Sequence, residues 1–295
     1  MIGLDGEVVW TTVFADSPGG GNPCPVVFGA EGATTAELQA RAAEFGAETA
    51  FVLPPEAGGD VRLRYFVPLH EMEMCVHATV ASAVLLGQSG RLPRSPAAVE
   101  TPLGVLDVAW DADAGEATVA QFAPQFGEPV DEDGRDRVLS ALGAPRSSVA
   151  AGVGPIQAVS TARPKLMIAL ADEAALDDLT PDFEQLWAAC DEFDVTGFYP
   201  FTLDAAGADA AARQFPRRAG YVEDPATGVA ACALGAYLAR HGGGPDGWHR
   251  WQIAQGRTLG RPSLIVVEAL VEHGAVVATR VGGRMQRSGP PTHRL

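Results

Sequence analysis

The chain has 295 residues, 47% hydrophobic and 20% charged, a composition that is ordinary for a globular protein and excludes a wholly disordered chain. Lys and Arg total 21 and Asp and Glu total 37, so the formal net charge is −16. Because so acidic a chain repels phosphate backbones, no nucleic-acid partner is expected. The length suits one large domain or two of ordinary size.

The sequence also bears on the cellular compartment. The opening residues, MIGLDGEVVWTTVFAD, lack the basic and apolar regions of a signal peptide. The longest apolar run, Ala78–Gly87, is too short to cross a membrane. The cysteines show no CxxC spacing, so we expect reduced thiols in a cytoplasmic protein, with no disulfide frame, metal site or membrane partner. They are Cys24, Cys75, Cys190 and Cys232.

In the first half, side-chain patterns predict several short strands and two helices. Thr34 with Glu37 forms a capping box that opens an amphipathic helix to about Phe45. The segment Cys75–Gly87 is apolar or small on every face, so this helix should be surrounded by protein. Turn-forming residues predict a loop over Asp16–Pro23. The predicted strands are Val8–Phe14, Pro25–Phe28, Ala50–Leu53, Val61–Phe66, Val105–Trp110 and Ala117–Gln121.

The second half repeats this arrangement after a Pro/Gly/Asp-rich passage, Pro124–Asp136, that suggests a domain boundary. Thr180, with Pro181 in the first turn, is expected to open one helix. Ala226–His241 is a second small-residue helix that ends at a glycine run. The predicted strands are Leu166–Leu170, Gly197–Leu203, Arg250–Ile253, Ser263–Ala269 and Ala275–Arg280.

These elements predict an α+β fold with two pseudo-symmetric lobes, each a strand-built, barrel-like shell around a central buried helix. The N-terminal lobe would contain residues 1–123 and 281–295, and the C-terminal lobe residues 124–280. A Rossmann sheet is disfavoured because strands and helices do not alternate regularly and GxGxxG is absent.

Polar residues gather where the two apolar helices begin, around Cys75–His77 and Asp224–Gly228. A helix N-terminus presents unpaired N–H groups and the positive end of the helix dipole, which favours a carboxylate. An ionisable group in such a place can act as an acid or a base near neutral pH. Asp224 is also suited to cap the second helix.

Six stretches, in this order, resemble the PhzF-like phenazine biosynthesis family of the diaminopimelate epimerase fold superfamily. The resemblance extends from about residue 8 to residue 285. It implies a two-lobed enzyme, usually a homodimer, that needs no metal or organic cofactor. The stretches are Gly21–Pro23, Glu48–Val52, Pro68-x-x-Glu71 with Cys75-x-His77-Ala78-Thr79, Arg213-x-Phe215-x-x-x-x-Gly220, Glu223–Gly228 and Gln255–Ser263.

By the same resemblance, the catalytic residues would be Glu48, His77 and Asp224. The glutamate would move a proton between carbon atoms of a small carboxylate substrate held between the lobes, which fits a carboxylate base beside an imidazole. The residues expected to contact the substrate are Asn22, Cys75, Val76, Ala78, Thr227, Gly228 and Val229.

Two residues depart from the family pattern. Val76 stands where the family commonly has Gly, and Val229 where the phenazine isomerases have Ser. Both valines make the site smaller and drier, which disfavours the dihydro-hydroxyanthranilate of phenazine synthesis. Cys75 could have a lowered pKa at a helix N-terminus, although a buried, inert side chain is favoured.

The favoured function is therefore a cofactor-independent isomerase acting on a small carboxylate-bearing metabolite of secondary metabolism. The alternatives are a C–C bond hydrolase of the alkylproline-pathway type on the same scaffold, and a catalytically silent small-molecule binding protein.

Overall fold

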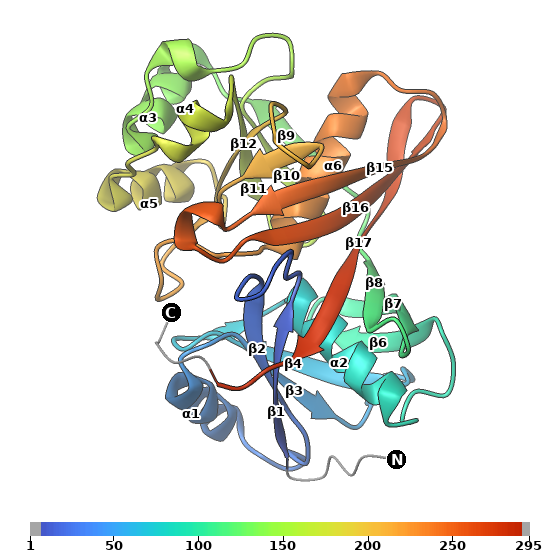
Figure 1. The fold of residues 1–295 in the computed structure, drawn as a ribbon. Helices are drawn as coiled ribbons and strands as arrows, with labels where there is room; N and C mark the ends of the chain where they lie inside the picture. The colour runs from blue at the N-terminus through green and yellow to red at the C-terminus, as the bar shows by residue number, and fades with distance from the viewer. Residues whose placement is uncertain (1–6, 291–295) are drawn as a thin grey trace. The chain divides into compact units, whose positions relative to one another are not determined.

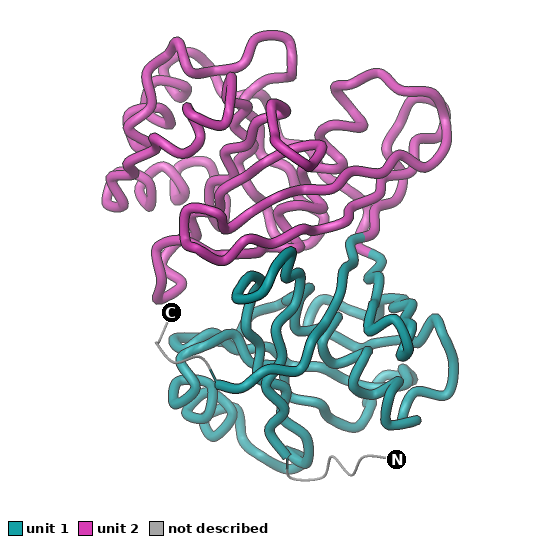
Figure 2. Tube along the Cα trace, viewed as in Figure 1, with its two compact units in different colours: residues 1–120, 281–295 teal, residues 121–280 magenta. Residues whose placement is uncertain are grey.

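The computed structural model describes residues 7–290. The chain divides into two compact units, which we call unit 1 (residues 1–120 and 281–295) and unit 2 (residues 121–280) (Figure 2). The first of these divisions lies three residues from the predicted lobe boundary at residue 123. Residues 1–6 and 291–295 lie outside the described residues, and so does the start of the segment that was predicted not to be a signal peptide. Among the described residues, no helix has the length and apolarity needed to span a membrane.

Unit 1 is a strand-built shell around one helix (Figure 1). Strand β1 runs antiparallel to β2, β2 parallel to β3, and β3 antiparallel to β4. The elements are β1 (Val8–Val13), β2 (Asn22–Val27), α1 (Thr35–Phe45), β3 (Thr49–Leu53), β4 (Val61–Phe66), β5 (Glu71–Met72), α2 (Val76–Gln88), β6 (Ala97–Thr101), β7 (Gly104–Asp111) and β8 (Glu116–Ala120).

Helix α2 is the central element of unit 1. Eleven of its thirteen residues are buried, and it packs against β1, β2, β3, β7 and β8. The predicted buried helix is therefore confirmed, because a segment without a polar stripe can be stable only where protein covers every face. The capping box that opens α1 is also confirmed, with Thr34 and Glu37 each accepting a hydrogen bond from the other's backbone N–H.

Unit 2 also contains a buried central helix, α6, which packs against β10, β11, β15 and β16. Twelve of the fifteen α6 residues are buried. The elements are β9 (Gln125–Pro129), α3 (Glu132–Leu142), β10 (Gln157–Ser160), β11 (Lys165–Leu170), α4 (Glu173–Asp177), α5 (Phe183–Glu192), β12 (Gly197–Thr202), β13 (Ala210–Ala212), β14 (Phe215–Pro216), α6 (Gly228–Gly242), β15 (Gly247–Gln255), β16 (Ser263–Glu272) and β17 (Ala275–Arg287), with 3₁₀ turns at Arg146–Ser148 and Arg257–Leu259. Strand β17 continues into unit 1, where it pairs with β1.

A second helical layer distinguishes unit 2. Helices α3, α4 and α5 lie together on one side of it (Figure 1). Leu142 of α3 and Leu186 of α5 share a buried cluster with Ile168 of β11. Strand β11 is buried along its whole length because α6 and this helical layer cover opposite faces.

One local prediction for unit 2 is wrong. The helix expected to open at Thr180 begins at Phe183, and Asp182 caps it by accepting two backbone N–H hydrogen bonds. A proline disfavours the helical conformation of the residue before it, so the chain enters this helix only after Pro181. The passage Pro124–Asp136, where a domain boundary was predicted, begins four residues after the division at residue 120 and contains β9 and the first turn of α3.

Candidate active site

Glu48 is positioned by the turn between α1 and β3. Helix α1 ends at Gly46, whose left-handed conformation (φ 64°) redirects the chain. Thr49 then begins β3 opposite Phe66 of β4. These contacts hold Glu48 at the entrance to a fully buried strand, where it is only 8% exposed.

The start of α2 is anchored to β4. Strand β5 pairs Met72 with Tyr65 and leads the chain toward the helix. The Tyr65 hydroxyl lies 2.8 Å from Thr79 Oγ1, which donates to the backbone oxygen of Cys75 at 2.8 Å. Cys75 is the N-cap residue of α2, but its side chain makes no capping hydrogen bond. Its thiol is directed to Glu48 instead.

Glu48, Cys75 and His77 form one buried cluster in unit 1. The Cys75 thiol donates a hydrogen bond to Glu48 Oε2 at 3.1 Å. His77 Nε2 lies 3.6 Å from the same oxygen. Cys75 Sγ is 3.5 Å from His77 Nδ1 and 3.7 Å from its Nε2. The structure therefore brings together the predicted base and the predicted imidazole, and adds a thiol to the same carboxylate.

Burial sets the protonation of this cluster. It lowers the pKa of His77, although the charge of Glu48 acts in the opposite direction. Burial, reinforced by Glu48, raises the pKa of the Cys75 thiol well above its usual value. The lowered pKa considered for Cys75 is therefore wrong. Burial raises the pKa of the thiol by more than the N–H groups at the start of α2 lower it. At neutral pH the cluster holds a neutral imidazole and a protonated thiol.

Asp224 belongs to a second polar cluster, at the start of α6 in unit 2. Thr227, the N-cap residue, makes no side-chain capping bond, and its hydroxyl donates to Asp224 Oδ2. Gln255 Nε2 donates to the Asp224 backbone oxygen at 2.7 Å. The expectation that Asp224 caps α6 is wrong, because it lies three residues before the N-cap and is held by Thr227 and Gln255.

Three further residues of this cluster were not singled out from the sequence. Tyr199 donates to Gln255 Oε1 at 3.0 Å, so both side chains are fixed. Gln214 is 1% exposed, and its Nε2 has no hydrogen-bond partner among the described residues. Gln255 begins a stretch used for the family resemblance and Gln214 lies inside another, so a search for polar side chains within those stretches could have found both.

A buried ion pair supports the loop that precedes α6. Arg213 Nε and Nη2 donate to Glu223 at 2.9 and 2.8 Å, and the two side chains are 11% and 8% exposed. Arg213 Nη1 also donates to backbone oxygens at the end of α4. The Arg213 and Glu223 positions of the family pattern therefore have a structural role, which is to fix the chain beside Asp224.

The remaining predicted residues lie at the starts of buried elements. Asn22 is the first residue of β2, and Val76 and Ala78 lie in the first turn of α2. Gly228 and Val229 are the first two residues of α6. All five are buried. That the residues of unit 1 and those of unit 2 act on one substrate stays a prediction.

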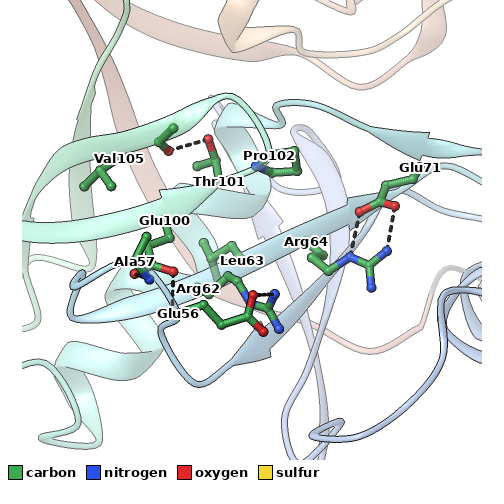
Figure 3. Close-up of a pocket in the computed structure, with 11 residues that line it drawn as sticks. Glu56, Ala57, Arg62, Leu63, Arg64, Glu71, Glu100, Thr101, Pro102 and Val105 are labelled. Carbon is green, nitrogen blue, oxygen red and sulfur yellow. Dashed lines mark hydrogen bonds and ion pairs between the residues drawn. The ribbon is translucent and has the colours of Figure 1, made fainter.

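Unit 1 has a cavity of about 350 Å³ (Figure 3). Arg64 and Arg62 line it, and each is already paired with a carboxylate, Glu71 and Glu56 respectively. None of the predicted site residues lines this cavity. Both arginines are neutralised within the wall, so we do not assign the chemistry to it.

Comparison with known proteins gives a consistent result. The family model described as "Phenazine biosynthesis-like protein" matches residues 11–285. The uncharacterized isomerase YddE of Escherichia coli K12 is 31% identical over 282 residues, covering 94% of each chain. The trans-2,3-dihydro-3-hydroxyanthranilate isomerase of Pseudomonas aeruginosa is 30% identical over 277 residues, covering 92% of each.

Among solved structures, a Bacillus anthracis phenazine biosynthesis protein of the PhzF family superposes with a TM-score of 0.85. It is 25% identical, and 96% of each chain is covered. The predicted fold class is confirmed by this likeness. The chain thus belongs to the PhzF-like phenazine biosynthesis family, whose curated relatives are named as isomerases.

Proposed function

We propose that this protein is a cofactor-independent isomerase that moves a proton between carbon atoms of a small carboxylate-bearing metabolite of secondary metabolism. Glu48 is the proton carrier. The observation that carries this proposal is the buried contact of one Glu48 oxygen with both the Cys75 thiol and the His77 imidazole, at the N-terminus of α2.

The reaction needs a base that can take up a proton and return it. The Glu48 carboxylate abstracts a proton from a carbon next to an electron-withdrawing group, and the electron pair delocalises into the substrate. The resulting carboxylic acid then gives the proton to a different carbon, so the composition of the substrate is unchanged. The neutral His77 imidazole can donate a hydrogen bond to the developing negative charge, and the dipole of α2 favours the same charge.

Incubation with candidate carboxylates in heavy water tests this function. We expect a product with the same molecular formula and carbon skeleton as the substrate, with deuterium on a substrate-derived carbon wherever the proton on Glu48 exchanges before its return. Mass spectrometry and NMR spectroscopy distinguish the alternatives. Two fragments would identify a C–C bond hydrolase, and saturable binding without any product would identify a binding protein. Either of these results would contradict the isomerase.

The two valines should restrict which substrate is accepted. Val76 and Val229 are buried at the starts of α2 and α6. We expect the native protein to convert trans-2,3-dihydro-3-hydroxyanthranilate poorly. Val229 lacks the serine hydroxyl, and a polar substrate group that loses this hydrogen-bond partner weakens binding by about 1–3 kcal/mol. The double variant Val76→Gly, Val229→Ser should bind this compound more tightly, as isothermal titration calorimetry would measure.

Thermal denaturation of the double variant is the control, since glycine within a helix costs about 1 kcal/mol. Efficient turnover of the same compound by the unmodified protein would refute the restriction and would assign the phenazine reaction to this chain.

A further inference from the structure

The Glu48–Cys75–His77 cluster also has the composition of a metal site. It offers one carboxylate oxygen, one sulfur and one imidazole nitrogen, and these ligand atoms lie within 4.8 Å of one another. Oxygen, sulfur and nitrogen are the three donor types that Zn²⁺ uses in proteins. Sequence spacing hides the set, because Glu48 lies 27 residues before Cys75.

The distances within the cluster fit a tetrahedral ion. At its usual bond lengths, tetrahedral Zn²⁺ holds one sulfur, one nitrogen and one oxygen ligand about 3.3–3.6 Å apart. In the structure, Glu48 Oε2 is 3.1 Å from Cys75 Sγ and 3.6 Å from His77 Nε2. The remaining separation, Sγ to Nε2, is 3.7 Å. Small side-chain rotations would bring all three atoms to the distances that the ion requires.

The charges balance as well. A Cys75 thiolate and a Glu48 carboxylate carry two negative charges, which a divalent cation neutralises in a place where isolated charges would be costly. The ion bonds to Cys75 Sγ and displaces the thiol proton, which leaves to water, so no oxidant or reductant is needed. The Glu48 side chain is 11% exposed and that of His77 3%, so we expect the ion to enter on the side of Glu48.

We propose that Glu48, Cys75 and His77 bind a thiophilic divalent cation such as Zn²⁺ or Cd²⁺, and that the bound ion inhibits the protein by occupying Glu48. The inhibitory part rests on the proposed function, whereas the binding part does not. The site is therefore regulatory rather than a cofactor site. Activity should survive exhaustive chelation and be lost when the metal is added.

Cobalt is the probe, because tetrahedral Co²⁺ with a thiolate ligand gives a sulfur-to-cobalt charge-transfer band that can be measured without any substrate. Titration of the reduced, chelator-treated protein under anaerobic conditions should produce this band and saturate at one ion per chain. Zn²⁺ should then displace Co²⁺, since it binds such ligands more tightly. Absence of the band at excess cobalt would overturn the proposal.

Variants locate the site. Cys75→Ser should abolish the band and weaken Zn²⁺ binding by more than the roughly 10–100-fold that loss of an outer-shell partner costs. Cys232→Ser is the matched control, a buried thiol of α6 outside the cluster, and should retain the band. If Cys75→Ser does not fold, Glu48→Gln supplies the test, because loss of the charged oxygen ligand should raise the cobalt concentration at which the band is half-saturated. A band that persists unchanged in the cluster variant would overturn the assignment.

Turnover measurements separate this inference from the proposed function. Zn²⁺ should inhibit the native protein, and a chelator should restore activity. Cobalt binding without inhibition by Zn²⁺ would contradict the inhibitory part and the role of Glu48, while leaving the metal site in place. Loss of activity in Glu48→Gln together with no cobalt band in the native protein would contradict the metal site alone.

Discussion

Glu48→Gln should lower turnover by about 10²–10⁴-fold, the contribution typical of a positioned general base. Glutamine has nearly the same shape and can still accept the hydrogen bond that Cys75 donates to Glu48, so the cluster should remain folded. What the variant loses is a group that can take up a proton and give it back. Steady-state kinetics in the heavy-water assay would measure the effect, with circular dichroism as a check on folding.

Glu44→Gln is the matched control for this variant. Glu44 lies four residues before Glu48, in the last turn of α1. Its side chain is 68% exposed and lies 3.8 Å from Arg41. Its replacement should leave turnover unchanged. Near-normal turnover in Glu48→Gln would remove Glu48 from the mechanism.

Arg213→Met should destabilise unit 2 by about 3–5 kcal/mol, because it leaves the buried Glu223 carboxylate without its counter-charge. The same change removes the hydrogen bonds from Arg213 Nη1 to the end of α4. For a body of this size the transition temperature should fall by roughly 6–20 °C. Because the chain contains two units, the transition should be followed with a probe that reports on unit 2 alone.

An exposed ion pair of similar geometry provides the comparison. Arg137 donates to Glu192 at 3.1 and 2.6 Å, but the two side chains are 50% and 44% exposed. Arg137→Met should therefore leave the transition almost unchanged, since solvent screens such a pair. If the transition temperature falls no further in Arg213→Met than in Arg137→Met, burial does not make the Arg213–Glu223 pair more stabilising than an exposed pair.

Elements with a strong local signal could be predicted from the sequence. Strand β4 has the predicted bounds, Val61–Phe66, because buried and half-buried side chains alternate along its first four residues. Helix α1 has both a capping box and a terminal glycine. Helices α2 and α6 were recognised because neither has a polar stripe, which only burial on every face allows.

Elements that tertiary contacts stabilise could not be predicted. Strand β13 (Ala210–Ala212) contains only alanine, a residue with low strand propensity, and exists because it lies between β12 and β15. Helix α3 begins in a passage rich in glycine and acidic residues, but Val138 and Leu142 bury its apolar face in the core of unit 2. Such packing has no local signature.

The candidate site was predicted only in part, because some of its contacts also depend on tertiary structure. The family pattern implied Glu48 and His77, and the structure places them in contact. The hydrogen bond from Cys75 to Glu48 joins residues far apart in the sequence. The residues around each of them therefore do not indicate that the two side chains meet. The support of Asp224 by Gln255 likewise depends on the approach of β15 to the start of α6.

The hydrogen bonds that link Tyr65, Thr79 and the backbone oxygen of Cys75 all run in one direction. A threonine hydroxyl carries a single proton, and Thr79 gives it to the backbone oxygen of Cys75. Tyr65 must therefore be the donor in its contact with Thr79. The series runs from phenol to hydroxyl to carbonyl and ends on an acceptor that has no proton to pass on. Protons cannot travel along this route to the Cys75 sulfur, so we expect the thiol proton to exchange through the contacts of the sulfur with Glu48 and His77.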